Sequence, residues 1–487
     1  MKKTELLPLV FAAFVLAGFP VPTPATPVAR AADPASAPAA PAMARLQAPE
    51  LEKLPNGLTV AWFTRSALPM VDISLIVKSG FRDDPVGRTG TAELVSALLD
   101  RGAGGMNAEE LARAVESLGA TRFSSADDDT FSVGLHGLSE DGPRLAEILA
   151  RMTLEPAFAE AEVERERERM IDHWAHVSDY AESMAGMVFY RAMRSGTSYG
   201  RGNFLSIAEL RKIGRAELVA YHKAHFTPGN SILMVVGKVD RERMKAGLLK
   251  LFGDPAKWSG GAPARSWKNY TDPKLNPRKG EILVVHRPGL AQAQVRFGLK
   301  APLIQSSDHY PLMVANAMLG EYFNSRLNSI IRDKLGLTYS IGSGFTFSKD
   351  FASFTIASST RNESVGQLVR KTVEVVRELR RGPVPVEETR MARDYLLGQF
   401  TLAHATQGAV AARWLRGDYY GLGDSYLNAF PAEVVKVNSP DVIAALNRHI
   451  DPDRLVIVIA GDAPAIEKSL KEARLGPVRR IGIKDLL

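Results

Sequence analysis

Short alternating runs and longer amphipathic runs of hydrophobic residues follow one another along this chain. The run VDISLIV at 71–77 alternates hydrophobic and polar positions, which is typical of a β-strand with one buried face. The runs at 91–101 and 108–119 repeat hydrophobic residues with helical spacing, and no strand-like run separates them. A doubly wound parallel sheet would require strict alternation of strand and helix. The pattern therefore predicts an α+β fold in which a mostly antiparallel sheet is covered by helices.

The pattern also repeats within the chain. His225 and His449 lie 224 positions apart, and each is followed three residues later by a proline and twelve residues later by a glycine. Both segments predict a helix that ends at the histidine, then a proline turn and a β-branched strand. A second pair, 130–141 and 353–364, repeats at an offset of 223. We therefore expect two homologous units with the same fold.

These repeats set the predicted domain boundaries. The N-terminal unit covers 47–255 and the C-terminal unit covers 281–487. The segment 256–280 is rich in Pro, Gly and Lys, which indicates an interdomain linker.

The N-terminus has the pattern of an export signal. Lys2 and Lys3 precede an apolar run at 6–19, which is too short to span a bilayer at about 20 residues. An A-x-A site at 29–31 predicts a signal peptide over 1–31, followed by an Ala/Pro-rich linker at 32–46. The alternative is an uncleaved anchor. An export signal on a chain without cysteine indicates the bacterial periplasm.

Composition narrows the function classes. The 487 residues carry a net charge of +7 with the two signs interspersed, so no basic run predicts a nucleic-acid partner. The glycine-rich segment at 102–106 lacks the lysine of a phosphate-binding loop. We expect no stable membrane insertion once the signal peptide is removed.

Two further segments carry a resemblance to a known family. The segments HFTPGNSILMVVG at 225–237 and SRLNSIIRDKLGLTYSIGSGF at 325–345, together with the two-unit plan, resemble the pitrilysin/insulinase family of inverted-motif zinc peptidases. The resemblance covers nearly all of 50–475. It implies a two-domain subunit built from peptidase-like units.

The resemblance also marks what is absent. Catalytic members carry G-x-A-H-x-x-E-H on a helix, where two histidines bind zinc and the glutamate is the general base. Gly90 and Ala92 keep this frame, but the ligand and base positions are Glu93, Ser96 and Ala97. Alanine offers no lone pair and serine is too weak a base to activate water. We expect these three residues to bind no metal.

The third ligand is absent as well. In the family it is a glutamate on a later helix, which corresponds to 160–176 here. The expected position falls near 171–174, where no glutamate stands, although Glu168 lies close by. His173 and His176 share this helix, but surface or core histidines are the commoner case. The resemblance thus implies no cofactor in this chain.

The C-terminal unit carries a second candidate site. Helical spacing predicts a helix over 322–336 capped by Gly336, then a strand over 337–347. Arg332 falls in the last helical turn and Tyr339 on the strand. The residues alone indicate a helix-end cation and a packed sheet tyrosine. The resemblance implies instead that Arg332 binds substrate carbonyls or a carboxylate and that Tyr339 stabilises an oxyanion.

The combined expectation is a subunit that is inactive alone. It would be the non-metal-binding subunit of a heteromeric periplasmic zinc metalloendopeptidase, with Arg332 and Tyr339 supplied in trans. The partner would carry zinc and the H-x-x-E-H motif, and the substrates would be unfolded peptides. One alternative is a metal-free structural, assembly or peptide-binding protein with the same fold. An independent enzyme with an unrelated site is the third possibility.

Overall fold

The computed structural model describes residues 45–202, 206–265, 267–272 and 274–482. The predicted signal peptide lies outside the described residues, as does all but the end of the Ala/Pro-rich linker. The described chain contains two six-stranded sheets, one in each half of the sequence. The predicted α+β class with mostly antiparallel sheets is confirmed.

The N-terminal half forms the first sheet. Only β2 and β8 pair in parallel, and every other neighbouring pair is antiparallel. The alternation in β3 places Val71, Ile73 and Leu75 in the core. In order across the sheet, the strands are β1 (Glu50–Lys53), β2 (Thr59–Phe63), β8 (Ser231–Gly237), β3 (Met70–Val77), β7 (Phe131–Leu138) and β6 (Thr121–Ala126).

The C-terminal half forms the second sheet. Here β9 pairs in parallel with both β13 and β14, and the remaining pairs are antiparallel. In order across the sheet, the strands are β11 (Ile341–Phe347), β12 (Ala352–Arg361), β10 (Gln292–Lys300), β13 (Val456–Gly461), β9 (Ile282–His286) and β14 (Val478–Ile481).

The two halves share one topology, so the predicted duplication is confirmed. The order β2-β8-β3-β7-β6 matches β9-β13-β10-β12-β11 strand for strand. The repeated histidines both end helices, α7 (Arg215–His225) and α14 (Ser439–His449), and a proline-initiated 3₁₀ turn follows each. Only the edge strand differs, because β1 precedes β2 and runs antiparallel to it, whereas β14 follows β13 and runs parallel to β9.

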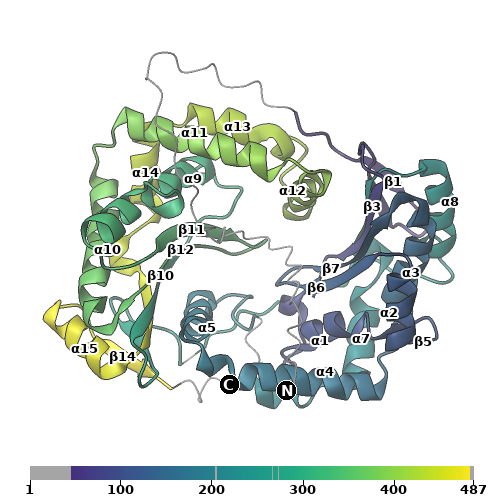
Figure 1. Ribbon diagram of the computed structural model, residues 1–487, viewed down its shortest axis with the longest axis horizontal. Helices are drawn as coiled ribbons and strands as arrows, with labels where there is room; N and C mark the ends of the chain where they lie inside the picture. The colour runs from purple at the N-terminus through teal and green to yellow at the C-terminus, as the bar shows by residue number, and fades with distance from the viewer. Residues whose placement is uncertain (1–44, 203–205, 266, 273, 483–487) are drawn as a thin grey trace, which may run out of the picture. The chain divides into compact units, whose positions relative to one another are not determined.

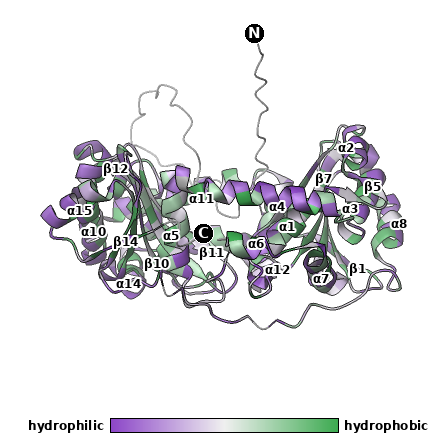
Figure 2. Ribbon diagram, turned by 90° about the horizontal axis from the view of Figure 1, so that it is seen from below, coloured by the Kyte–Doolittle hydropathy of each residue, from purple (hydrophilic) through white to green (hydrophobic). Residues whose placement is uncertain are grey.

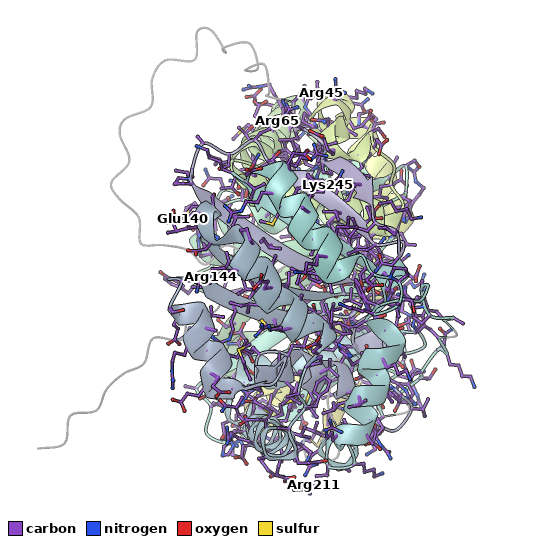
Figure 3. The ribbon with its side chains drawn as sticks, turned by 90° about the vertical axis from the view of Figure 1, so that its right-hand side faces the viewer. Arg45, Arg65, Glu140, Arg144, Arg211 and Lys245 are labelled. Carbon is purple, nitrogen blue, oxygen red and sulfur yellow. The ribbon has the colours of Figure 1, made fainter. Side chains whose placement is uncertain are left out.

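Helices cover one face of the N-terminal sheet. The helices α3 and α8 pack together, and α3 lies against β3 and β7. Figure 3 shows these two helices with Arg144 and Lys245 on their outer surface. The helices of this half, besides α7, are α1 (Thr91–Leu98), α2 (Ala108–Glu116), α3 (Gly142–Leu154), α4 (Glu160–Ala175), α5 (Ala181–Arg194), α6 (Ile207–Leu210) and α8 (Arg241–Phe252).

A short hairpin, β4 (Gly102–Ala103) with β5 (Met106–Asn107), separates α1 from α2. The sequence pattern predicted no strand there. The glycine-rich turn supplies it, because Gly104 and Gly105 both adopt positive φ, which glycine tolerates without strain.

The polar outer side of α4 is visible as purple ribbon in Figure 2.

The C-terminal sheet has its own helical cover. The helices α10 and α15 pack together, as do α9 and α14 (Figure 1). Besides α14, the helices are α9 (His309–Asn316), α10 (Val365–Arg381), α11 (Val386–Ala403), α12 (Gln407–Tyr420), α13 (Tyr426–Lys436) and α15 (Ala463–Glu472), with π-helical segments at Ala317–Glu321 and Asn328–Lys334.

Each half also provides a helix to the other half's sheet. The helix α5 of the N-terminal half packs against β10 and β13, with Phe189 fully buried there. Conversely, α12 of the C-terminal half packs against β8, and Trp414 meets Phe63 edge to face at 5.9 Å. The second face of each sheet is therefore covered by a helix from elsewhere in the sequence. No sequence periodicity could indicate this, because an amphipathic helix does not specify which sheet it covers.

A group of charged side chains around the buried Arg82 also joins the halves. Arg82 contacts Asp129 at 3.2 Å and Asp350 at 2.7 Å, and its guanidinium lies 3.4 Å from the ring centroid of Trp267. The Tyr199 hydroxyl donates to Asp129 at 2.9 Å. Burial raises the pKa of Asp129, although Arg82 opposes this rise. The β6–β7 turn is thereby linked to the β11–β12 turn.

Within the described part of the chain, no helix is both long and apolar enough to cross a bilayer. The predicted domain boundaries stay a prediction.

Candidate functional site

The first candidate site lies on α1, and its start is fixed by a buried carboxylate. Gly90 caps the helix with φ +102°, a conformation that favours glycine. The Asp84 carboxylate accepts hydrogen bonds from the backbone N–H groups of Gly90 and Ala92, each at 2.7 Å. Burial raises the pKa of Asp84 to about 8, against the opposing effect of these two donors. Sequence reasoning missed Asp84; its place six residues before a helix N-cap was the available signal.

The predicted degenerate positions share one helical turn. Glu93 is half-buried, and burial raises its pKa to about 7, an effect that Arg169 on α4 partly opposes. Ser96 is buried, with its Oγ 3.1 Å from the Oγ of Ser124 on β6. Ala97 contributes only a methyl group. This face of α1 thus presents one carboxylate and one hydroxyl that is already hydrogen-bonded.

The helix α4 adds an arginine near this carboxylate. Arg169 Nε donates to Glu166 at 2.6 Å, and Glu166 also pairs with Arg101 at 3.0 Å. Glu168 is exposed and Ile171 is buried. Across the described ranges, no three side chains of His, Asp or Glu lie close enough together to hold a metal ion. The donor set around Glu93 does not fit zinc, which needs about three protein ligands.

Three histidines of the N-terminal half contact polar groups of their own fold. His222 contacts the Thr153 carbonyl at 2.9 Å near the end of α3, and burial lowers its pKa to about 4. His225 contacts the Ser79 hydroxyl at 2.9 Å. His176 contacts the Asp172 carbonyl at 2.7 Å.

The second candidate site surrounds the π-helical segment Asn328–Lys334. The predicted helix start at 322 is wrong, because 322–325 form a turn and helical structure begins only at 326. The predicted cap is confirmed: Gly336 has φ +59°, and its N–H donates to the Arg332 carbonyl at 3.1 Å. Insertions of π-helix are frequent at functional sites.

Arg332 lies within this segment and is largely covered. Its Nε donates to Asp333 Oδ1 at 2.8 Å, and its guanidinium carbon lies 3.8 Å from the ring centroid of Phe323. Its side chain keeps 18% of its area exposed. Arg332 is therefore accessible from one side and oriented by two neighbours.

Tyr339 differs from the prediction. The strand β11 begins at Ile341, and Tyr339 lies in the preceding bend with 90% of its surface exposed. The Thr338 hydroxyl accepts from the Ser340 N–H at 3.1 Å and donates to the Ser340 carbonyl at 2.8 Å. This local turn replaces strand pairing. The expectation of a strand tyrosine packed on the sheet is wrong, and the phenol is free to meet another molecule.

Arg332 and Tyr339 lie on either side of the Gly336 turn. Within the described residues, no hydrogen bond joins their side chains. Both can donate to an oxygen atom of a bound molecule, whereas α1 has Glu93 and Ala97 in place of the two histidines that would hold a zinc ion. The molecule thus combines the duplicated α+β architecture, a zinc helix that lacks its ligands, and two donors near the Gly336 turn, of which Tyr339 is exposed and Arg332 is largely covered. That combination defines a peptidase-like protein without a metal site of its own among its described residues.

Comparison with known proteins identifies the family. Residues 60–203 match the insulinase family (peptidase family M16), and residues 212–396 match the peptidase M16 inactive domain. The chain belongs to the M16 (insulinase) family.

Relatives and solved structures agree with this assignment. A Mycobacterium bovis protein named as an uncharacterized zinc protease is 25% identical over 76% of this chain and 83% of its own length. Subunit 1 of the mitochondrial cytochrome b-c1 complex of Bos taurus is 23% identical over 56% of this chain and 55% of its own. The crystal structure of a peptidase M16 inactive domain from Pseudomonas fluorescens has the same fold, with a TM-score of 0.76 and 24% identity over 85% of this chain and 98% of that one.

Proposed function

We propose that this chain is the non-metal-binding subunit of a heteromeric periplasmic zinc metalloendopeptidase. The observation that carries the proposal is a contrast within one molecule. The zinc-ligand positions are occupied by Glu93 and Ala97 and the general-base position by Ser96, whereas Tyr339 is 90% exposed beside a turn that also carries Arg332.

The two donors would act on a peptide held at the partner's active site. The partner, with its H-x-x-E-H motif, would supply the Lewis acid and the general base. Arg332 would bind a carbonyl or a carboxylate of the substrate. The Tyr339 hydroxyl would donate to the oxygen that becomes negatively charged during attack, a contact that contributes about 2.7–4 kcal/mol to such transition states.

The relatives support an assembled function. A protein of this family is a subunit of the cytochrome b-c1 complex, so the fold is compatible with work inside a larger assembly. Others are named zinc proteases, and their sequences align with most of this chain. The periplasmic location rests on the N-terminal signal pattern and on the absence of cysteine.

Reconstitution with a motif-bearing subunit tests the proposal. We expect the purified chain alone to bind no stoichiometric zinc and to cleave no unfolded peptide. Mixing it with an H-x-x-E-H subunit of the same two-unit plan is expected to give peptidase activity that a chelator removes. Tyr339→Phe is expected to lower the turnover of the mixture by ~10²-fold, the scale of losing one oxyanion donor.

The matched control is Tyr180→Phe, because Tyr180 is also an exposed tyrosine, at 68%, but lies at the start of α5 in the other half. Its turnover is expected to equal that of the unchanged mixture. An unaltered rate for Tyr339→Phe would remove Tyr339 from the mechanism.

A metal-free binding or assembly protein is the second candidate function. The cytochrome b-c1 relative favours it, because that protein is named as a subunit of a respiratory complex and not as a protease. Co-purification from the native periplasm with metal analysis of each component separates the two. A zinc-loaded partner favours the peptidase subunit, and a complex without zinc favours the assembly protein.

A further inference from the structure

Phe323 is an exposed aromatic side chain with one occupied face. Its side chain is 71% exposed, yet the Arg332 guanidinium lies 3.8 Å from its ring centroid. Stacking of an arginine on an aromatic ring is favourable, and it orients the planar guanidinium. The other face of Phe323 remains open to solvent.

The turn that carries Phe323 is fixed to the helix that carries Arg332. The Ser325 N–H donates to the Tyr322 carbonyl at 3.0 Å, and Asn328 Nδ2 donates to Ser325 Oγ at 3.0 Å. The Tyr322 ring packs on Tyr395 of α11 with centroids 5.4 Å apart. Phe323 therefore keeps its place although it is mostly exposed.

Asp333 holds a second side of the same guanidinium. Its carboxylate accepts from Arg332 Nε at 2.8 Å and from Nη2 at 3.4 Å. Neighbouring residues do not normally face each other on an α-helix, and this pair lies in the π-helical segment. Arginine has five N–H donors. Within the described chain no hydrogen bond involves Nη1, so that end of the fork can still bind an oxygen of a ligand.

We propose that Phe323 and Asp333 are positioning residues for Arg332, and that the open face of Phe323 selects peptides with an apolar or aromatic side chain next to the oxygen bound by Arg332. The inference deepens the proposed function, on which it rests, by naming the substrate class. The Asp333 carboxylate beside the same site disfavours peptides with an acidic side chain at that position, because like charges repel.

Peptide binding to the mature chain alone tests this inference without the partner. The probes are dye-labelled, unfolded ten-residue peptides that differ at one position, which is Phe, Leu, Ala or Asp. Fluorescence anisotropy is expected to give affinities in the order Phe, Leu, Ala, Asp, with Phe about 5- to 10-fold tighter than Ala, the scale of one aromatic contact.

Phe323→Ala is expected to remove the preference for Phe over Ala, and Phe323→Trp is expected to retain it. Asp333→Asn is expected to reduce the discrimination against the Asp peptide. The control is Leu402→Ala, because Leu402 is similarly exposed at 70% but lies near the end of α11. A preference that survives in Phe323→Ala overturns the inference, and so does a wild-type chain that binds none of the four peptides.

These outcomes are separate from the fate of the proposed function. A Phe323-dependent preference in a chain that activates no zinc subunit would leave the inference standing and refute only the peptidase role. An active mixture with no Phe323-dependent preference would refute the inference and leave the proposed peptidase role standing.

Discussion

At the scale of single residues, the former zinc face carries a carboxylate where the family has a neutral imidazole. Glu93 is half-buried on α1, and among the described residues the nearby charge of Arg169 is what opposes the effect of burial on its pKa. The folded protein therefore holds a proton on Glu93 to a higher pH than the unfolded chain does. Glutamate at this position therefore affects the free energy of unfolding as well as the ability to bind zinc.

This consequence can be measured as a pH dependence. The pKa of Glu93 rises from an ordinary value of 4.5 to about 7 on folding, so the folded state binds more protons between these values. The free energy of unfolding is therefore expected to fall as the pH rises from about 4.5 to about 7. Glu93→Gln removes this contribution, so the variant is expected to gain about 1–3 kcal/mol relative to wild type between pH 5 and pH 8.

Urea denaturation at pH 5 and at pH 8 measures the free energy of unfolding of wild type and Glu93→Gln. The control is Glu168→Gln, because Glu168 lies on the exposed side of α4. Parallel pH profiles for wild type and Glu93→Gln would show that Glu93 ionises normally.

Prediction from sequence was most direct for residues that belong to a local motif. Glu93, Ser96 and Ala97 were assigned through the resemblance to the family's zinc motif, and they lie within one turn of α1. The contact between Arg332 and Phe323 was not foreseen. Helical periodicity placed Phe323 inside the predicted helix, whereas in the structure it lies in the turn that precedes the helix. Tyr339 was misplaced because a side-chain-to-backbone turn at Thr338 overrides its β-propensity.

At the scale of elements, the packing of α5 on the C-terminal sheet depends on a glycine in β10. Gly298 of β10 leaves room for the ring of Phe189, and a Cβ at this position would overlap that ring. The pattern of the sequence predicted both the helix and the strand. It could not predict that they meet, because they belong to different halves and the contact is specified only by shape.

The contact predicts a coupled pair of substitutions. Gly298→Ala is expected to lower the free energy of unfolding by about 1–3 kcal/mol through overpacking against Phe189. In the background of Phe189→Leu the same change is expected to cost less, because the shorter side chain leaves space. Urea denaturation of the four proteins gives the coupling energy.

Gly186→Ala is the control, because Gly186 lies in α5 with open space around its Cβ position. It is expected to be neutral or to stabilise the helix by up to about 1 kcal/mol. Additive effects at Gly298 and Phe189 would contradict the packing described for α5.

At the scale of the whole molecule, the Arg82 cluster links turns from both halves. The Arg82 side chain is 1% exposed, whereas Asp129 is 7% and Asp350 is 51% exposed. Loss of the buried partner leaves a charge that water cannot reach. Loss of the exposed partner leaves most of the pairing intact.

Substitutions of the two aspartates are therefore expected to lower the free energy of unfolding by unequal amounts. Asp129→Asn is expected to lower the free energy of unfolding by about 3–5 kcal/mol, the cost of breaking a buried pair. Asp350→Asn is expected to cost less than about 1 kcal/mol, as for exposed pairs. Both are measured by urea denaturation, and equal losses would indicate that Arg82 does not depend on its buried partner.

The helix α5 of the N-terminal half covers the C-terminal sheet, and α12 of the C-terminal half covers the N-terminal sheet. We therefore expect that neither half has a complete core when it is expressed alone. Expressed separately, residues 47–280 and 281–487 would each expose the apolar sheet face that the other half covers. Each fragment is expected to aggregate, and co-expression is expected to give a soluble complex of the two. Size-exclusion chromatography distinguishes these outcomes, and a soluble, folded single fragment would contradict the prediction.

The same contacts predict that the two halves stay together without the covalent connection between them. A protease that nicks the exposed stretch at 259–262 would separate the polypeptide into two pieces that still elute together under native conditions. Only a denaturing gel would reveal the cut. Sequence variation in that stretch is still limited by conformation, because Gly260 adopts φ +118° and its carbonyl accepts from the Gly229 N–H at 3.1 Å.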